Sequence, residues 1–331
     1  MQYIKKLLIG LFLGANVLTV LLLWTSCACT WVSPSVVPQQ TVMTLAFPIF
    51  LMANLAFVFF WLISKARFAV LSVLGMLVAG GYVMDYCPLQ CQDEVPEDST
   101  LLLVSYNIGT MAGPENHQAF VQYVKETDAD ILCLQEVADP SLLTSAVFKA
   151  MLDSMGYKMQ QQENRCVLSK LPFVGSASSL PYPSKTGNGT TICRLRCGND
   201  TLLVVNNHLE SYGLEKEDLQ LDTLSMEGIK NSSLMHKLHD AGLLRKQQAK
   251  EVKQQIRQSP HPVVVVGDFN AIPLSYVYWK IRLGLRDCFL ESSWGRLGNT
   301  YKKGPIAIRI DYILCSRKLT PIKCEVDRVK Y

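Results

Sequence analysis

The first part of the chain is a long stretch of apolar residues without charge. No Asp, Glu, Lys or Arg occurs from Leu7 to Ser64. Within the first 86 residues, three apolar runs stand out, at about 7–24, 44–63 and 68–84. At a rise of 1.5 Å per residue, such runs are long enough to cross a bilayer as helices. The pattern therefore predicts a membrane anchor of three transmembrane helices over residues 1–86.

The first apolar run allows two other interpretations. A cleaved signal peptide also combines basic residues with a short apolar run. The sequence around Ser26 and Cys27 is similar to a lipoprotein processing site, although Trp24 fits such a site poorly. Neither alternative explains the two further apolar runs, so the three-helix anchor is favoured.

Basic residues beside the apolar runs predict the orientation of this anchor. Lys5 and Lys6 precede the first run, and Lys65 and Arg67 lie between the second and the third. Basic residues near transmembrane helices accumulate on the cytoplasmic side, so both positions are expected there. Three crossings then place the remaining chain on the non-cytoplasmic side. The prediction is a multi-pass protein of the cell membrane, with the lipid bilayer as a partner and no specific protein partner.

Residues 87–100 separate the anchor from the rest of the chain. This segment is rich in Pro, Asp and Glu, which is typical of a linker. On the non-cytoplasmic side, Cys87 and Cys91 would be the nearest candidates for a disulfide. A second cysteine pair or nearby histidines are missing, which excludes a zinc site. Most other cysteines of the second half lie in apolar runs and are interpreted as buried thiols.

Beyond residue 100, apolar runs alternate with helix-prone segments, which indicates an α/β fold. Strands are expected at residues 101–106, 129–134, 165–171, 190–196, 202–207, 263–266, 309–315 and 322–331. Helices are expected at residues 117–127 and 141–155, and the polar segment 214–258 is helix-prone. Gly198, Asn199 and Asp200 form a good hairpin turn between two of the strands.

The segment Pro262–Pro273, PVVVVGDFNAIP, combines a buried strand with polar chemistry. Four consecutive valines predict a strand that is buried on both faces. Gly267 allows a tight turn, and Asp268 and Asn270 follow two positions apart. A carboxylate and an amide at a strand exit suit a hard cation and a phosphate oxygen. An Asp/Asn turn that closes a core strand is the structural alternative.

Other polar residues also lie where predicted strands end. Asn107 follows LLLVSY, Glu136 follows DILCLQ, and His208 follows LLVVNN, while Asp311 lies within RIDYIL. Each residue alone could be a cap or a turn residue. Their recurrence at strand ends, together with Asp268 and Asn270, indicates that the ends converge on one rim that carries a site.

At these positions the chain resembles the endonuclease/exonuclease/phosphatase superfamily, which includes DNase I-like nucleases, neutral sphingomyelinases and inositol-polyphosphate phosphatases. Five motifs carry the resemblance in the order of the family: SYN, LQEV, NNHLES, GDFNAIP and RIDYIL. The resemblance covers residues 101–331. It implies a four-layer αββα sandwich of two mostly antiparallel sheets packed face to face with helices outside. The full expectation is thus a DNase I-like domain preceded by three transmembrane helices.

The resemblance also implies roles for individual residues. Glu136 would be the main Mg²⁺ ligand, with Asn107 beside it or on the phosphate; Mn²⁺ is an alternative ion. His208 would bind the scissile phosphate and protonate the leaving oxygen. Asp268 and Asn270 would position or activate the attacking water and bind the phosphate. Two further carboxylates complete the set, in which Asp311 would orient a second histidine and Glu163 would orient His208.

These roles imply a metal-dependent phosphoesterase that hydrolyses a phosphodiester or phosphomonoester by in-line attack of water. Substrate classes left open are nucleic acid, phospholipid and inositol phosphate. Family members continue with a Ser-Asp-His motif that these 331 residues do not contain, so a truncated C-terminus is expected. The alternative is a catalytically impaired phosphate-binding or scaffold membrane protein. A transporter is disfavoured, because the apolar runs carry no charge.

Charge adds little to this interpretation. The formal net charge is +4, which neither requires nor excludes a polyanionic partner. The basic segment 245–253 is interpreted as a solvated helix face. The four histidines other than His208 are interpreted as solvated as well.

The long segment 211–247, which follows the His208 motif directly, is the expected specificity element.

Overall fold

The computed structural model describes residues 2–90, 100–109, 114–137, 140–180, 183–184, 187–213, 233–303 and 306–327. The chain divides into two compact units. Unit 1 consists of Met1–Cys87, Gly213–Lys246 and Pro273–Trp279. Unit 2 consists of Pro88–Tyr212, Gln247–Ile272 and Lys280–Tyr331. Most of the predicted acidic linker, with Cys91 of the suggested disulfide, lies outside the described residues.

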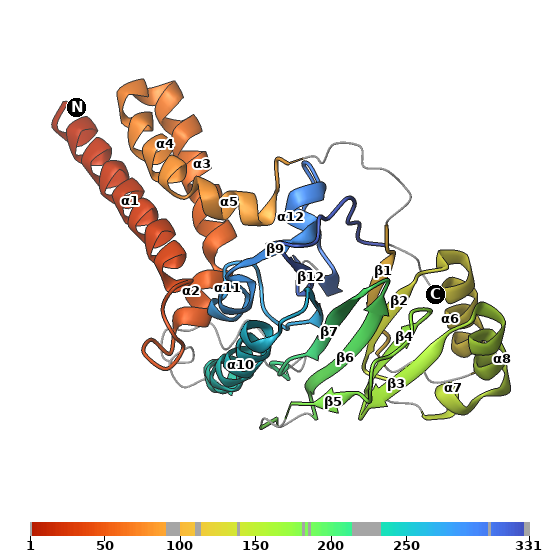
Figure 1. Ribbon diagram of the computed structural model, residues 1–331. Helices are drawn as coiled ribbons and strands as arrows, with labels where there is room; N and C mark the ends of the chain where they lie inside the picture. The colour runs from red at the N-terminus through yellow and green to blue at the C-terminus, as the bar shows by residue number, and fades with distance from the viewer. Residues whose placement is uncertain are drawn as a thin grey trace. The chain divides into compact units, whose positions relative to one another are not determined.

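The N-terminal part of unit 1 is helical (Figure 1). Its elements are α1 (Gln2–Cys29), α2 (Gln40–Leu45), α3 (Phe47–Ser64), η1 (Ala66–Phe68), α4 (Ala69–Val78) and α5 (Gly80–Tyr86). By length and composition, α1 and α3 can each cross a membrane. The third apolar run is not one straight helix, because α4 and α5 are bent by 60° at their break. The break is followed by Gly80 and Gly81, which weaken a helix at this point. A third crossing therefore exists only if this bent pair is one span.

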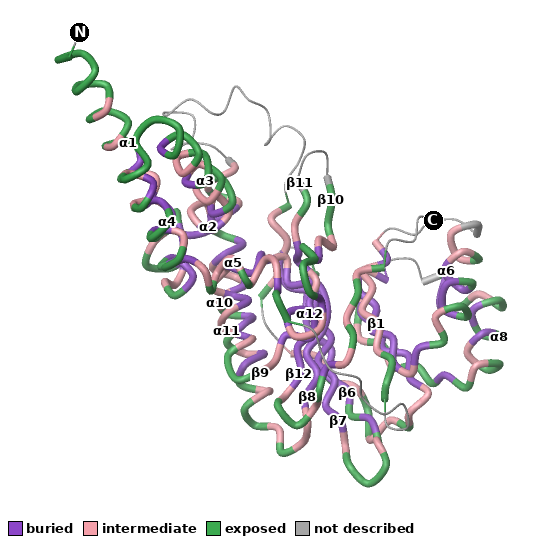
Figure 2. The backbone as a smooth tube through the Cα atoms, turned by 90° about the horizontal axis from the view of Figure 1, so that it is seen from above, coloured by how far each residue is buried: buried purple, intermediate pink, exposed green. Residues whose placement is uncertain are grey.

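Three of these helices share a buried polar network. Trp61 Nε1 on α3 donates to Asn16 Oδ1 on α1 at 2.9 Å, and Asn16 Nδ2 donates to Ser72 Oγ on α4 at 2.6 Å. Ser72 Oγ in turn donates to Asn54 Oδ1 at 3.3 Å. By contrast, many apolar side chains of these helices are exposed, Ile63 at 90%. Figure 2 shows exposed residues along much of α1. Polar contacts inside and apolar residues outside are the arrangement expected of helices packed in lipid.

Unit 1 also contains two later segments of the chain, from α10 (Ser233–Gln258) and α11 (Tyr276–Arg282). The rings of Trp31 and Trp279 lie 4.3 Å apart. Lys246 Nζ donates to Ser35 Oγ at 2.7 Å. A Cβ atom on Gly242 would lie 3.5 Å from the side chain of Pro34, so the helix approaches closely at this glycine. The loop after α1 is thus packed against α10 and α11 within this unit.

Unit 2 contains two main β-sheets. The smaller sheet has the order β1-β2-β4-β3, formed by β1 (Leu103–Asn107), β2 (Ile131–Gln135), β4 (Arg165–Ser169) and β3 (Lys158–Gln162). β1 and β2 are parallel, and the other neighbours are antiparallel. Helices α6 (Pro114–Thr127), α7 (Pro140–Thr144) and α8 (Ala146–Met155) belong to this half. Phe120 of α6 and Phe148 of α8 form one core with Leu132 and Leu134 of β2.

The larger sheet has the order β5-β6-β7-β8-β12-β9. Its strands are β5 (Ser178–Ser179), β6 (Gly189–Cys197), β7 (Asp200–His208), β8 (Val263–Asp268), β12 (Asp311–Ser316) and β9 (Leu285–Asp287). Only β7 and β8 are parallel, and the other described pairs are antiparallel. Helix α12 (Cys288–Ser292) follows β9, and β10 (Tyr301–Lys303) and β11 (Ile306–Ile308) form a separate hairpin.

A second core lies between the two sheets. It contains Cys133 and Val167 from the smaller sheet and Val204 and Val266 from the larger one. The four-valine run is β8, buried along its whole length as predicted. Both sheets are mostly antiparallel and packed face to face, which fits a DNase I-like α/β fold. The outermost layering stays a prediction.

One expectation was wrong in this region, and a second was wrong in part. Residues 322–327 do not form a strand, although they alternate in exposure; residues 328–331 lie outside the described part. The segment 245–253 is a solvated helix face only in part: Lys250 is exposed, but Arg245 and Lys253 are only 2% and 5% exposed. The long aliphatic stem of Lys253 packs inside, while its amine donates to the carbonyl of Ile281.

Candidate active site

The predicted site residues come together at one edge of unit 2. Asn107 ends β1, His208 ends β7, and Asp268 ends β8. In the strand register, Asp268 lies beside His208 on β7 and beside Asp311 on β12. The end of a parallel strand and the start of an antiparallel neighbour meet at the same sheet edge, which explains this grouping. Strand order alone therefore brings three of the candidates side by side.

Hydrogen bonds connect this row to Glu136, which follows β2 in the other sheet. Nδ2 of Asn107 donates to Glu136 Oε1 at 2.9 Å and to Asp268 Oδ2 at 3.1 Å. His208 Nε2 lies 3.2 Å from the same oxygen of Glu136. Nδ1 of His208 is buried and has no hydrogen-bond partner among the described residues. Asn107, Glu136, His208 and Asp268 thus form one polar cluster across both sheets.

The backbone at the site is locally strained. Glu136 has a φ of 54° and Asn270 a φ of 47°, both in the left-handed region that non-glycine residues rarely adopt. Gly267 has a φ of 113°, and a Cβ atom there would lie 2.0 Å from the carbonyl oxygen of Asn207. Only glycine fits this position, so it allows β7 and β8 to approach each other just before His208 and Asp268.

Burial and crowding set the charge state of the carboxylates. Burial, and then the neighbouring Asp311, raises the pKa of Asp268 well above its usual range. Burial also raises the pKa of Asp311. The hydrogen bond from His208 lowers the pKa of Glu136, and the bond from Asn107 adds to this effect. Carboxylates held together in a low-dielectric site repel one another unless a proton or a cation compensates them.

The donor set fits a divalent cation. Glu136, His208 and Asp268 each offer one ligand atom, and these atoms all lie within 4.8 Å of one another. Two of these donors are carboxylates, and the amide of Asn107 bonds to both of them. Oxygen-rich sites of this kind suit hard cations such as Mg²⁺ or Mn²⁺. Burial, and then the charge of Asp311, raise the pKa of Asp268, and a bound cation would offset both effects by stabilising the ionised carboxylate.

Asn270 lies directly beside the His208 segment. Its backbone N–H donates to Asp268 Oδ1 at 2.7 Å, and its Nδ2 donates to the carbonyl of Leu209 at 3.0 Å. The same carbonyl accepts a bond of 2.7 Å from Nδ2 of Asn188. Two amides therefore fix the backbone immediately after His208.

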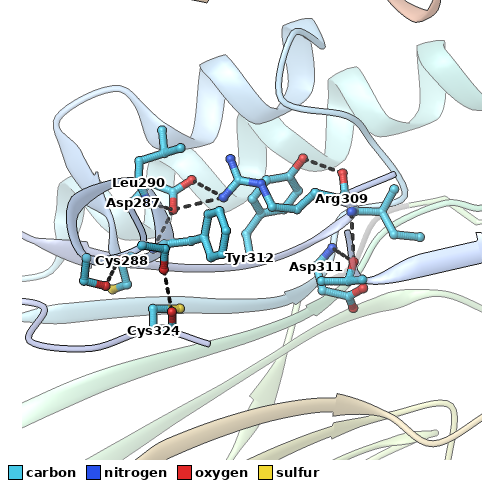
Figure 3. Close-up of polar contacts among 12 residues, drawn as sticks. Asp287, Cys288, Leu290, Arg309, Asp311, Tyr312 and Cys324 are labelled. Carbon is cyan, nitrogen blue, oxygen red and sulfur yellow. Dashed lines mark hydrogen bonds and ion pairs between the residues drawn. The ribbon is translucent and has the colours of Figure 1, made fainter. Parts of the chain in front are cut away.

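A buried ion pair between Arg309 and Asp287 lies close to Asp311 (Figure 3). Arg309, two residues earlier, bonds to both carboxylate oxygens of Asp287 at 3.2 and 3.1 Å. Its guanidinium also lies 4.9 Å from the ring centre of Tyr312. The N–H of Asp311 donates to Thr300 Oγ1 at 3.1 Å. In Figure 3, Arg309 points away from Asp311 and towards Asp287, which anchors the start of β12.

Glu163 lies with a different partner from the one suggested by the family resemblance. Its carboxylate forms an ion pair with Arg165, and its side chain is 64% exposed. Arg165 is fully buried beneath Gly189, where a Cβ atom would lie 2.5 Å from the guanidinium. Gly189 pairs with His208 across β6 and β7. Within the described residues, Glu163 is thus linked to the site through this arginine and glycine.

Sequence reasoning missed several supporting residues. Asn188 is one, and Gln248 on α10 is another, since its Oε1 accepts from the N–H of Glu210 at 2.9 Å. Ser184 donates to the Glu210 carboxylate at 2.5 Å. The Gly-Asn-Gly sequence at 187–189 was a visible turn signal, but nothing in its spacing indicated a contact with Leu209.

Comparison with known proteins places the chain in a family. Residues 104–330 match the model of the Endonuclease/Exonuclease/phosphatase family. The chain therefore belongs to this family, whose members are phosphoesterase hydrolases. Residues 6–86 match a second model, a Domain of unknown function (DUF8431). A search of curated protein sequences found no match.

Three solved structures illustrate what the chain is similar to. A humanised D. rerio TDP2 with 14 mutations is 15% identical and has a TM-score of 0.50, covering 68% of this chain and 87% of its own. ANGEL2, a 2',3'-cyclic phosphatase, is 18% identical with a TM-score of 0.44, covering 66% and 83%. The human Nocturnin catalytic domain with bound sulfate is 20% identical with a TM-score of 0.44, covering 68% and 86%. The first of these shows a shared fold, and identities this low say nothing of the substrate.

Proposed function

We propose that this chain is a membrane-anchored, metal-dependent phosphoesterase that hydrolyses a phosphodiester or phosphomonoester by in-line attack of water. The observation that carries the proposal is the cluster in which Asn107 joins Glu136 to Asp268 while Glu136 contacts His208. Family membership makes a hydrolase the natural class, and the cluster supplies the groups that such chemistry needs.

Glu136 and Asn107 are proposed to hold a divalent cation, Mg²⁺ or Mn²⁺. Glu136 suits this role because its lowered pKa keeps it ionised at neutral pH. Asn107 fixes the orientation of both neighbouring carboxylates through its two hydrogen bonds. When bound, such a cation supplies Lewis-acid stabilisation of phosphate charge.

His208 and Asn270 are proposed to hold the phosphate oxygens. Both residues lie next to Leu209, whose carbonyl is fixed by two amides. His208 would also donate a proton to the leaving oxygen. Asp268 would position or deprotonate the attacking water, a role that its raised pKa suits, because a carboxylate with a higher pKa is a stronger base. Asp311, its neighbour in the sheet, would orient a further acid–base group.

Activity with simple substrates tests the proposal. The full chain in detergent is assayed with bis(p-nitrophenyl) phosphate and p-nitrophenyl phosphate, with Mg²⁺, with Mn²⁺ and with a chelator. Turnover that requires the metal and falls about 10²- to 10⁴-fold in His208→Ala is expected. Glu136→Gln, which removes a charge from the proposed metal site, should lower turnover as well. Its matched control is Glu126→Gln, because Glu126 is an exposed residue of α6. Turnover that survives the chelator or His208→Ala would overturn the proposal.

The alternative is a catalytically impaired phosphate-binding or scaffold membrane protein. Metal and phosphoester binding without turnover of any substrate would favour this alternative.

If the chain is active, the choice among nucleic acid, phospholipid and inositol phosphate is made by comparing the wild type with His208→Ala. Hydrolysis of only one class by the wild type, and of none by His208→Ala, would assign the substrate.

The membrane part of the proposal is that α1, α3 and the bent pair α4–α5 form three spans. Apolar residues on their outer faces support it, as does the buried network around Asn16. The proposed domain boundary near residue 86 and the non-cytoplasmic location of unit 2 belong to the same proposal.

A further inference from the structure

A fully buried pair of amides connects the two sheets of unit 2 beneath the site. Gln135 on β2 and Asn206 on β7 are both 0% exposed. Nε2 of Gln135 donates to Oδ1 of Asn206 at 2.7 Å. The pair lies next to the inter-sheet core, which is otherwise built from residues such as Cys133 and Val204. Two polar side chains in such surroundings cost desolvation unless they are bonded, so their bonding pattern is informative.

Each side-chain hydrogen bond described for Asn206 crosses from its own sheet to the smaller sheet. Besides accepting from Gln135, it donates through Nδ2 to the carbonyl of Leu134 at 3.0 Å and to that of Cys166 at 3.2 Å. Leu134 and Cys166 face each other on β2 and β4, at the last paired position before the chain turns into Glu136. Asn206 therefore secures, from the opposite sheet, the strand β2 that leads to this carboxylate and its neighbour β4.

Gln135 extends the connection to a third strand of the smaller sheet. Its Nε2 also lies 3.3 Å from Ser105 Oγ on β1, and its backbone carbonyl accepts from the N–H of Ile108 at 3.0 Å. Both contacts bracket Asn107, which follows Ser105 by two residues. The amide pair thus connects strands that deliver Asn107, Glu136 and, two residues after Asn206, His208.

We propose that Gln135 and Asn206 are positioning residues that hold Glu136 against His208 and so set the geometry of the metal and phosphate site. This inference rests on the proposed function. Neither residue touches the reacting groups, since each acts through the backbone of its neighbour.

Apolar side chains would hold the sheets together but would not fix their register as closely. Hydrophobic packing is non-directional, whereas the directional bonds that Gln135 Nε2 and the Asn206 amide make across the sheets favour one arrangement. Glu136 has a left-handed backbone, and such a conformation persists only where the surroundings determine it. The contact of 3.2 Å between Glu136 and His208 joins two sheets, so a small slide of one sheet would separate them.

Two neighbouring asparagines allow a matched test. Asn207 is also 0% exposed, but its Nδ2 donates to the carbonyls of Val205 and Val266, both in its own sheet, at 3.0 Å. Asn206→Leu and Asn207→Leu therefore remove equally buried amides, and only the first breaks the link between sheets. Both full-length variants are compared with the wild type for melting temperature, calorimetric Mg²⁺ affinity, kcat and KM.

Both variants are expected to melt earlier. Only Asn206→Leu is expected to weaken Mg²⁺ binding by about 10- to 100-fold, as loss of residues that orient metal ligands does. Its kcat is expected to fall by up to about 10²-fold with KM for the phosphodiester little changed, because the reacting groups are misplaced by a fraction of an ångström to about 1 Å. Gln135→Met, which keeps the volume and loses the donor, is expected to act in the same direction, and it replaces Asn206→Leu if that variant does not fold.

Equal effects of Asn206→Leu and Asn207→Leu on Mg²⁺ affinity and kcat would overturn the inference and leave the amide pair a purely structural one. Unchanged affinity and kcat in a folded Asn206→Leu variant would overturn it too. A wild-type chain that binds neither Mg²⁺ nor Mn²⁺ would instead overturn the proposed function, and the inference with it.

Discussion

Nε2 of His208 lies 3.2 Å from Oε1 of Glu136, although the two residues come from different sheets. The contact closes a row that starts at Asp311 and runs through Asp268 and His208 on neighbouring strands of the larger sheet. Asn107 completes it from the smaller sheet. The site therefore exists only when the two sheets are packed together, so binding of the proposed metal would report that packing.

Loss of the Glu136 charge should weaken metal binding. Glu136→Gln keeps the size of the side chain and its contact with Asn107, but it removes a negative charge from the donor set. The Kd for Mg²⁺ should rise by at least about tenfold, because hard cations depend on ionised carboxylates. Titration calorimetry measures the change, and Glu126→Gln should match the wild type. An unchanged Kd in a folded Glu136→Gln variant would exclude Glu136 as the main ligand.

The buried pair of Asp287 and Arg309 should be among the most sensitive points of unit 2. Asp287→Asn leaves the guanidinium of Arg309 buried without its charged partner, at a cost of about 3–5 kcal/mol. The exposed pair of Glu325 with Arg296 is the comparison, and Glu325→Gln should cost no more than about 1 kcal/mol. Thermal or denaturant unfolding followed by fluorescence compares the two variants. Equal losses would mean that the buried pair contributes no more than a surface one.

Lys253 should make stability depend on pH in the alkaline range. Burial, with Arg257 and Lys280 nearby, lowers the pKa of Lys253 to about 8 from its ordinary 10.5. Between these values the unfolded chain binds more protons than the folded one, so stability rises with pH across this window. The rise attributable to Lys253 is on the order of 3 kcal/mol, at 1.36 kcal/mol per pKa unit.

The measurement compares the wild type with Lys253→Met between pH 7.5 and 10.5. Lys253 also donates to the carbonyls of Ile281 and Leu283, so the variant changes stability at every pH. The prediction therefore concerns the slope: the melting temperature of the wild type should gain on that of the variant as the pH rises. Parallel curves would show that the pKa of Lys253 is not lowered in the folded state.

The residues at strand ends could be placed from the sequence because the rule is local. A buried run followed by a polar residue marks a strand exit, and this identified Asn107, His208 and Asp268 correctly as strand-terminal. The partners across the sheets could not be predicted in the same way. A strand's period of two tells which face Asn206 occupies, but not that its amide meets Leu134 and Cys166.

The errors have physical reasons of the same kind. Residues 322–327 alternate in exposure as a strand does, but among the described residues they have no ladder partner, and a strand requires one. Arg245 and Lys253 were assigned to water by charge, whereas their stems are buried in the folded chain. The sequence shows the alternation of polar and apolar residues. Whether such a segment pairs in a sheet, or whether a charged side chain is buried, depends on contacts with distant parts of the chain.

The orientation of the chain in the membrane should follow from its flanking charges. Lys5 and Lys6 precede the first span, and Lys65 and Arg67 lie between the second and the third, so these residues are expected on the cytoplasmic side. With three spans, unit 2 then lies on the opposite side. Protease added to intact cells, or to spheroplasts where an outer membrane is present, should digest it, while a cytoplasmic reporter stays intact.

A charge-swapped variant makes this test specific to the proposed cause. Replacing Lys5, Lys6, Lys65 and Arg67 with Gln, and adding a basic residue by Val36→Lys in the loop after α1, reverses the bias of the flanking charges. Val36 is 72% exposed, so the added charge needs no room in the interior. Protection of unit 2 in this variant, together with digestion in the wild type, is the expected result. Protection in the wild type until the membrane is lysed would contradict the predicted orientation. It would also indicate that the bent pair α4–α5 does not cross the membrane, which leaves two spans instead of three.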